Sequence, residues 1–452
     1  FSPNGDGRKD TLPIRQSSAP GDDWTGAILD SAGKTVREFA WRSSLENLSW
    51  DGRDAQGNVA PDGLYRYVLR SEDAAGNRFE RSLQGIRVDN RPVQAFVTAS
   101  AAGFSPNGDG VADTISFSLI VNPRDGVENW SLAMVDSGGA ARRTLRGSGA
   151  TPIPAEFAWD GKGDDGAVTQ GEYAAVLTVN YQKGDRVEAR SAAFALDSEG
   201  PRVSLRLSPE FFSPDNDGVD DELRIALSVV DASAIDSWRF EVFEVAVQEG
   251  AAAARRERLF FAWSGRGRPA ERLTWDGRSQ RGELVEAATD YPYRFTISDV
   301  WGNVSVVEGV IKVDVLVVRD GDRLKIKVPS IVFRANFADF RDLTPDVVAR
   351  NEEVLKRIAT ILNRFRDYRI RVEGHANSIS KMTGANAAAV EREETTELLP
   401  LSTQRAQAVM NKLIEFGVEA RRLSARGLGS SEPVVPFTDA ENRWKNRRVE
   451  FI

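Results

Sequence analysis

One phrase occurs three times in the first half of this 452-residue chain, and it constrains the fold more than any other feature. It reads FSPNGDGRKDT from Phe1, FSPNGDGVADT from Phe104 and FSPDNDGVDDE from Phe212. A second phrase, containing WDG, follows each copy, with its tryptophan at Trp50, Trp159 and Trp275. Two phrases repeated in a constant order predict three copies of one structural unit, each of roughly 100 residues.

Within these units, apolar and polar residues alternate over short stretches such as residues 114–121 and 203–208. Alternation with a period of two is typical of strands that have one buried face. About seven such strands, separated by Gly, Asp and Asn turns, predict a β-sandwich in each unit. The predicted units are residues 1–92, 93–201 and 202–316.

The phrase FSPNGDGxxD followed by WDG resembles the immunoglobulin-like (Ig-like) repeat of flagellar hook-capping (FlgD-like) proteins and of many bacterial surface proteins. The resemblance extends over residues 1–316. It implies three all-β Ig-like sandwiches and says little about function, because a fold of this kind serves many functions.

Closely spaced oxygen atoms surround a glycine turn in the opening phrase, and two interpretations stand. Ca²⁺ loops use such ligands, although the distal bidentate Glu of an EF-hand is absent. In the preferred interpretation, the side chains accept hydrogen bonds from their own backbone in a structural turn. The candidate residues are Asn4, Asp6, Asp10, Asn107, Asp109, Asp113, Asp215, Asp217 and Asp221. WDG similarly predicts a core tryptophan followed by a tight turn.

Repeat 3 is the longest between its two phrases, with 63 residues from Phe212 to Trp275. The extra stretch predicts a longer hairpin tip or a short helix at the surface.

Residue counts exclude several function classes. The chain has no cysteine and a single histidine, His375, so disulfides, thiolate chemistry and multi-histidine metal sites are impossible. A net charge of −8 argues against a general nucleic-acid binder. No apolar run approaches the ~20 residues of a membrane span. Since the chain opens inside a repeated phrase, we expect a signal or anchor upstream of it.

After residue 316 the pattern changes from strands alone to strands and helices. Thr344-Pro345-Asp346 predicts a helix start, and Ser402 or Thr403 predicts the cap of a second helix that ends near Gly417. Strands are expected around residues 317–333, 368–377, 422–429 and 446–452. The order β–α–β–α–β–β predicts an α+β domain over residues 317–452.

The stretches VEGHANS, LSTQRAQAV, RLSARGLG and NRRVEFI in this domain resemble the OmpA-like domain, the peptidoglycan-binding module of envelope proteins. The resemblance implies non-covalent binding of diaminopimelate in cell-wall stem peptides. In the family, an Asp in a GHTD loop contacts an ammonium and an Arg in LSxxRA contacts a carboxylate. These positions fall on Asn377 and Arg405. A fixed anion and a bidentate guanidinium suit an amino-acid zwitterion.

Three departures from the family pattern lie at this site. Asn377 lacks the negative charge, which removes about 1–2 kcal/mol of charge-assisted hydrogen bonding. Residues 379–400 form an insertion between Asn377 and Arg405 that predicts a short helix over the pocket. The usual Asn before LS falls on Leu398.

The candidate peptidoglycan-binding residues are Asn377, Arg405, His375, Ala376, Ser378, Asn446 and Arg448. Two of these residues have an alternative to ligand contact. His375 could pack under the loop without touching the ligand. Arg405 could cap carbonyl groups or pair with an insertion glutamate (Glu391, Glu393 or Glu394).

The sequence as a whole predicts a non-catalytic structural protein of the cell envelope, without a cofactor. We expect it in the periplasm of a diderm bacterium. Its OmpA-like domain would bind peptidoglycan with weakened or altered recognition, and its Ig-like repeats could contact other envelope proteins. The alternative is a protein–protein interaction scaffold whose pocket is occluded by residues 379–400.

Overall fold

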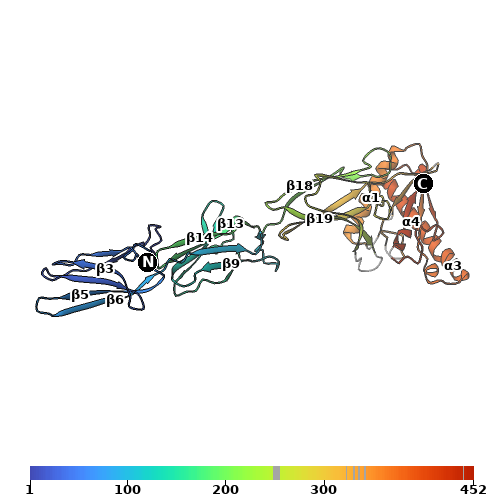
Figure 1. The fold of residues 1–452 in the computed structure, drawn as a ribbon. Helices are drawn as coiled ribbons and strands as arrows, with labels where there is room; N and C mark the ends of the chain where they lie inside the picture. Colours follow the sequence, from blue (N-terminus) through green and yellow to red (C-terminus); the bar gives the residue numbers. More distant parts are fainter. Residues whose placement is uncertain (248–254, 322, 329–330, 334–335, 341–342, 441) are drawn as a thin grey trace. The chain divides into compact units, whose positions relative to one another are not determined.

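The computed structural model describes residues 1–452 apart from 248–254, 322, 329–330, 334–335, 341–342 and 441. The chain divides into two compact units, Phe1–Glu199 (unit 1) and Gly200–Ile452 (unit 2) (Figure 1). Unit 1 consists of strands and turns, whereas unit 2 adds helices after residue 344. None of the described helices is long and apolar enough to cross a membrane.

The first half of unit 1 combines a two-stranded sheet with a four-stranded sheet. Its strands are Leu12–Ile14 (β1), Trp24–Leu29 (β2), Thr35–Trp41 (β3), Leu48–Trp50 (β4), Gly63–Glu72 (β5) and Arg78–Val88 (β6). β1 pairs with β4, and the larger sheet has the order β3-β2-β5-β6. Ile14 and Trp50 from the small sheet share one hydrophobic core with Ile28, Tyr65 and Val88 from the large one.

The second half of unit 1 repeats this plan with its own core. Its strands are Gln94–Ala99 (β7), Gly103–Phe104 (β8), Ile115–Asn122 (β9), Val127–Asp136 (β10), Ala141–Ser148 (β11), Glu156–Trp159 (β12), Gly171–Tyr181 (β13), Arg186–Arg190 (β14) and Phe194–Leu196 (β15). One sheet has the order β12-β9-β7 and the other β11-β10-β13-β15-β8, with β14 also paired to β13. Phe117, Trp159, Tyr173 and Phe194 lie in the core between them.

Unit 2 begins with a third pair of sheets. Its strands are Arg202–Ser208 (β16), Phe211–Phe212 (β17), Leu223–Val230 (β18), Ile235–Val247 (β19), Arg255–Arg266 (β20), Arg272–Trp275 (β21), Asp290–Asp299 (β22) and Val304–Val313 (β23). The sheets have the orders β16-β18-β21 and β17-β23-β22-β19-β20. β19 and β20 form the longer hairpin expected for this repeat, and its tip lies outside the described residues.

The two repeated phrases contact each other in every sheet pair. Trp50, Trp159 and Trp275 are almost fully buried, and each indole N–H donates to the carbonyl three residues later, at 2.8–2.9 Å. The glycine of each WDG has a positive φ, and a Cβ on it would lie 2.5–2.7 Å from Pro3, Pro106 or Pro214. Only glycine fits there, because L side chains avoid this conformation and the proline fills the space. The core tryptophan and tight turn predicted from WDG are confirmed.

The aspartate that closes each opening phrase organises a turn. The carboxylates of Asp10, Asp113 and Asp221 each accept two backbone N–H groups, at 2.5–2.9 Å. The turn lies where the chain leaves each sheet pair, since the amides of Asp89, Asp197 and Asp314 donate to the carbonyls of Phe1, Phe104 and Phe212. These hydrogen bonds are those of the structural turn that the sequence favours.

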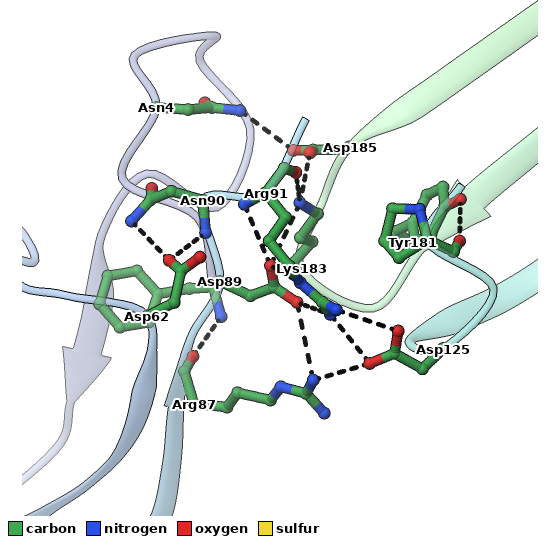
Figure 2. A network of polar contacts seen from close by, with 12 residues as sticks. Asn4, Asp62, Arg87, Asp89, Asn90, Arg91, Asp125, Tyr181, Lys183 and Asp185 are labelled. Atoms are coloured by element: carbon green, nitrogen blue, oxygen red, sulfur yellow. Dashed lines mark hydrogen bonds and ion pairs between the residues drawn. The ribbon is translucent and has the colours of Figure 1, made fainter. Parts of the chain in front are cut away.

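A charged network joins the two halves of unit 1 (Figure 2). Lys183, in the turn between β13 and β14, is 6% exposed and lies 3.0 Å from Asp185 and 3.6 Å from Asp89. Asp89 also accepts from Arg91 at 2.6 Å, and Arg91 reaches Asp125 at 2.8 Å. Residues of the first half therefore share buried charges with residues of the second half.

The last part of unit 2 is an α+β layer that follows the predicted order, with one additional strand before α1 and two additional short helices, α2 and α3, in the insertion. Its strands are Val318–Asp320 (β24), Arg323–Val328 (β25), Ile370–Gly374 (β26), Leu423–Gly427 (β27) and Val449–Phe451 (β28). Its helices are Pro345–Arg364 (α1), Ile379–Thr383 (α2), Ala387–Glu393 (α3) and Leu399–Glu415 (α4), with short turns Glu394–Leu398 (η1), Ala420–Arg422 (η2) and Arg443–Asn446 (η3). The sheet order is β24-β25-β28-β26-β27. Val354, Ile358, Val372 and Val409 pack between helices and sheet.

Two details of the helices differ from the sequence predictions. Thr344 precedes α1 as expected, but its side chain makes no capping hydrogen bond. Ser402 and Thr403 do not cap α4, which begins at Leu399 and continues from α3 through the π-helical turn η1. Both hydroxyls donate to the Leu399 carbonyl instead. The insertion thus extends the predicted second helix at its N-terminal end.

Candidate ligand-binding site

The loop His375–Ser378 follows β26 at the edge where β26 and β27, which run parallel, both end. The amide of His375 donates to the Arg448 carbonyl at 3.0 Å, and the amide of Ala376 donates to the Gly429 carbonyl at 2.8 Å. The loop is therefore held on one side by Arg448, the residue before β28, and on the other side by the segment after β27. This places the predicted ligand-reading residues on a rigid part of the domain.

His375 packs beneath the loop among buried charges. It is 3% exposed, and its Nε2 lies 3.8 Å from Oε2 of Glu450, which is fully buried. Glu450 also contacts Arg448 at 2.6 Å and Lys325 at 2.5 Å. Burial raises the pKa of the Glu450 carboxyl, but Arg448 and Lys325 outweigh it and leave that pKa below its ordinary value. The packing interpretation of His375 fits this arrangement.

Glu373, His375 and Glu450 could in principle hold a metal ion, because one ligand atom from each lies within 4.8 Å of the others. Their charges argue against it. Arg371 lies 2.5 Å from Glu373, while Lys325 and Arg448 neutralise Glu450. A divalent cation would enter a buried site where both carboxylates are already paired, so we assign these residues to an ion-pair network.

Among the opening turns, the third brings the carboxylates of Asp215, Asp217 and Asp221 within 4.8 Å of one another. Burial and the two neighbouring carboxylates raise the pKa of Asp215, although a hydrogen bond from the Val317 amide opposes them. Asp217 and Asp221 accept backbone N–H groups in the same turn. The Ca²⁺ alternative stays a prediction for these residues.

Asn377, at the position of the family Asp, is turned toward η3. Its Nδ2 donates to the Arg443 carbonyl at 2.6 Å. Its Oδ1 is buried and accepts no hydrogen bond from the residues that the structure describes. The side chain therefore uses its donor within the protein and keeps an acceptor, which is the atom that an ammonium would need.

The insertion supplies a carboxylate to the end of the same loop. Glu393 accepts from the Ser378 hydroxyl at 2.6 Å and from the amides of Ile379 and Ser380 at 2.7 and 2.9 Å. Burial raises the pKa of the Glu393 carboxyl, but these hydrogen bonds more than compensate and hold it below its ordinary value. Ser378 is 1% exposed and its Oγ also caps α2. The Glu393 carboxylate of the insertion thus accepts hydrogen bonds from the donor groups that follow Asn377.

The next residue, Glu394, closes the neighbouring segment. Its carboxylate accepts from the amide of Ser430 at 2.9 Å and from the Ser430 hydroxyl. A Cβ on Gly429, whose φ is +54°, would collide with Glu394 Oε1. The sequence predicts Glu393 and Glu394 only as partners of Arg405, and their contacts with the two loops are visible only in the structure.

Arg405 lies in the second turn of α4 and is 6% exposed. Its Nε donates to the Phe337 carbonyl at 3.0 Å, and its guanidinium lies 5.1 Å from the centre of the Phe333 ring. The carbonyl-capping alternative is confirmed for this nitrogen. A cap at Ser402 or Thr403 would place Arg405 in the first turn of the helix, but η1 and α3 precede α4, so Arg405 does not lie at a helix N-terminus.

The two remaining candidate residues, Asn446 and Arg448, make hydrogen bonds to other parts of the protein. Asn446, 1% exposed, accepts from the amides of Val434 and Val435 and donates to the Val435 carbonyl. Arg448 pairs with Glu450 and donates to the Glu432 carbonyl at 3.1 Å. The structure thus gathers His375, Arg448 and Glu450 in one network. It directs Asn377 toward η3 and Arg405 toward the segment before α1.

Comparison with known protein families agrees with these two architectures. The model of the OmpA family matches residues 340–447, and that of the FlgD Ig-like domain matches residues 11–75. Residues 340–447 form an OmpA-family domain. The resemblance inferred from the GHAN and LSTQRA motifs is confirmed, and the Ig-like resemblance is confirmed for residues 11–75.

Curated relatives align with part of the chain. They are the peptidoglycan-binding protein ArfA of Mycobacterium tuberculosis (31% identical over 106 residues), the probable lipoprotein YiaD of Escherichia coli (29% over 137) and the outer membrane porin F of Pseudomonas aeruginosa (32% over 167). These alignments cover 24%, 30% and 37% of this chain. They span 28%, 54% and 37% of the relatives, so the chain covers about half of their length or less.

Proposed function

We propose that this chain is a non-catalytic structural protein of the cell envelope whose OmpA-family domain binds peptidoglycan without a covalent bond. The match of residues 340–447 carries the proposal, and the name of the relative ArfA points the same way. The site adds a buried acceptor at Asn377 and an arginine on α4, as a zwitterionic amino acid requires.

Recognition of the diamino acid is weakened or altered in this proposal. Asn377 offers a neutral oxygen to the ligand ammonium, so one charge-assisted hydrogen bond is replaced by a weaker one. Arg405 is already engaged by the Phe337 carbonyl and the Phe333 ring, and these contacts must be exchanged for a ligand carboxylate. Both features lower affinity for the stem peptide, or favour a diamino acid other than diaminopimelate.

The N-terminal repeats serve as an arm in this proposal. Three Ig-like modules, at residues 1–92, 93–201 and 202–316, would separate the wall-binding domain (residues 317–452, insertion 379–400) from other envelope components or contact them. The periplasm of a diderm bacterium is the proposed location, in line with the names of the relatives YiaD and porin F.

Co-sedimentation with purified sacculi tests this function. The chain should pellet with sacculi, and Arg405→Ala should reduce the bound fraction several-fold because the ligand carboxylate loses its partner. Arg421→Ala, which removes an exposed arginine paired with Glu419, is the matched control and should bind normally. Failure of the unmodified chain to pellet with sacculi of any diamino-acid type would overturn the proposal.

A second function is favoured by Glu393. Its carboxylate already satisfies the donors of Ser378, Ile379 and Ser380, so the insertion can act as an internal ligand. The domain would then be a protein–protein interaction scaffold with an occluded pocket. Deleting residues 379–400 together with Asn377→Asp should create binding to diaminopimelate peptides where the unmodified chain shows none. If that variant folds and still ignores the peptides, occlusion is not the reason.

A further inference from the structure

A lysine next to the candidate site is buried against the third repeat. Lys445 belongs to η3 and is 7% exposed. Its Nζ lies 3.1 Å from Glu244 Oε1 and 3.9 Å from Glu286 Oε1. Both glutamates belong to the repeat that precedes the OmpA-family domain, Glu244 to β19 and Glu286 to the segment before β22. The repeat and the domain therefore share a buried ion pair.

Glu244 interrupts an apolar pattern in its strand. Phe240 and Val242 point into the core of the repeat, and Glu244 follows at the same spacing of two with 2% of its area exposed. The register of β19 against β20 shifts between Val242 and Phe243, directly before it. The extra residue of this bulge is Phe260 on β20, and the shift places Arg258 opposite Glu244. Its second oxygen accepts from Arg258 at 2.6 Å, so Lys445 and Arg258 hold this carboxylate between them.

The segment that Lys445 anchors also carries contacts of the ligand loop. Arg443, two residues earlier, supplies the carbonyl that orients the Asn377 amide at 2.6 Å. Asn446, the residue after Lys445, accepts hydrogen bonds from the amides of Val434 and Val435. A displacement of η3 would therefore move the group that fixes Asn377.

We propose that Glu244 is a positioning residue for the candidate ligand site. The β19–β20 hairpin of the third repeat sets the place of η3, and η3 orients Asn377. The third repeat is then part of the binding module and more than a spacer. The consequence for ligand affinity rests on the proposed peptidoglycan-binding function, whereas the positioning itself does not.

Hydrogen–deuterium exchange of the whole chain, followed by peptide mass spectrometry, tests the positioning. Glu244→Gln keeps the shape of the side chain and removes its charge. Exchange in peptides covering residues 376–380 and 443–447 should become about tenfold faster, because the anchored segments open more often. The control Glu257→Gln, an exposed position on the same hairpin, should leave both peptides unchanged.

A double-mutant cycle with Lys445→Met separates coupling from general damage, because the two changes together should cost less than the sum of each alone. Should Glu244→Gln fail to fold, Lys445→Arg, which keeps the charge, and Lys445→Met supply the same comparison. Unchanged exchange at 376–380 in a folded Glu244→Gln or Lys445→Met variant would overturn the positioning role.

Sacculus binding gives the functional arm of the test. Glu244→Gln should weaken co-sedimentation several-fold relative to Glu257→Gln, and equal binding by the two variants would overturn the effect on the ligand. If the unmodified chain itself does not bind sacculi, the proposed function fails, and the exchange result alone decides the positioning role.

Discussion

Two lysines, one in each unit, are buried at a joint, by which we mean the contact region between two neighbouring parts of the same unit. Lys183 bridges Asp89 and Asp185 where the two halves of unit 1 meet, and Lys445 bridges Glu244 and Glu286 where the third repeat meets the OmpA-family domain. Both are less than 10% exposed. They differ in what lies next to them. Lys183 is surrounded by other members of the joint, whereas Lys445 lies two residues from the carbonyl that orients Asn377. We therefore expect the Lys183 ion pairs to stabilise only the contact inside unit 1, and the Lys445 ion pairs also to position Asn377.

The largest effect is expected at the joint of unit 2. Lys445→Met leaves Glu244 buried with one cationic partner fewer. Breaking a buried pair in this way costs about 3–5 kcal/mol. Urea unfolding, monitored by hydrogen–deuterium exchange in peptides of residues 202–452, should show this loss of stability. Co-sedimentation should show weaker sacculus binding. Normal sacculus binding by a destabilised but folded Lys445→Met variant would show that the unit 2 joint does not act on the ligand site.

Lys183→Met should destabilise unit 1 by a smaller amount, about 3 kcal/mol at most, because Asp89 keeps its hydrogen bonds from Arg91. Binding to sacculi should not change, since no candidate ligand residue belongs to unit 1. Hydrogen–deuterium exchange in peptides of residues 1–199 during urea unfolding measures the stability of unit 1. Co-sedimentation measures the binding to sacculi. A loss of binding would show that the unit 1 joint also acts on the site.

Acid should weaken the unit 1 joint. Hydrogen bonds from Arg91 hold the pKa of Asp89 well below its ordinary value, and those from Arg91 and Arg87 lower the pKa of Asp125 from 3.8 to about 2. A carboxyl with a depressed folded pKa stabilises the fold above its unfolded pKa, and this contribution is lost as pH falls. The stability of residues 1–199 should therefore decrease from about pH 4 toward pH 2. A stability that stays constant over this range would contradict the pairing shown in Figure 2.

The smallest effect is expected at the rim of the same joint. Asp125 and Arg87 are both about half exposed, at 53% and 54% of their side-chain area. Exposed pairs contribute about 0–1 kcal/mol, so Asp125→Asn should lower the stability of unit 1 by less than about 1 kcal/mol. It should also reduce the loss of stability on acidification. A cost as large as that of Lys183→Met would show that the rim matters as much as the buried centre.

Features that depend on neighbours in the chain were predictable from the sequence. The opening turns, the buried WDG tryptophans and the order of strands and helices after residue 316 all follow from local patterns. The sequence also places Asn377 and Arg405, through their motifs. The start of α4 was missed, because Ser402 and Thr403 look like caps while the actual helix continues from the insertion through η1.

Contacts between distant segments were beyond the sequence. The roles of Glu393 and Glu394 depend on how α3 folds back over the loops, which helical spacing does not reveal. Glu244 left one signal, a glutamate at an inward-facing position of RFEVFEV. A charged residue in such a position implies a buried partner, but only the fold identifies it as Lys445.

We propose that residues 340–447 bind the wall peptide through the loop at Asn377, with weaker recognition because the negative charge of the family Asp is missing. Titration calorimetry of a diaminopimelate-containing stem peptide, with the unmodified chain and with Asn377→Asp, tests it most directly. We predict weak binding by the unmodified chain and about tenfold tighter binding by the variant, since about 1.4 kcal/mol of charge assistance is restored. Absence of binding by both folded proteins, or equal affinity for the two, would contradict the claim.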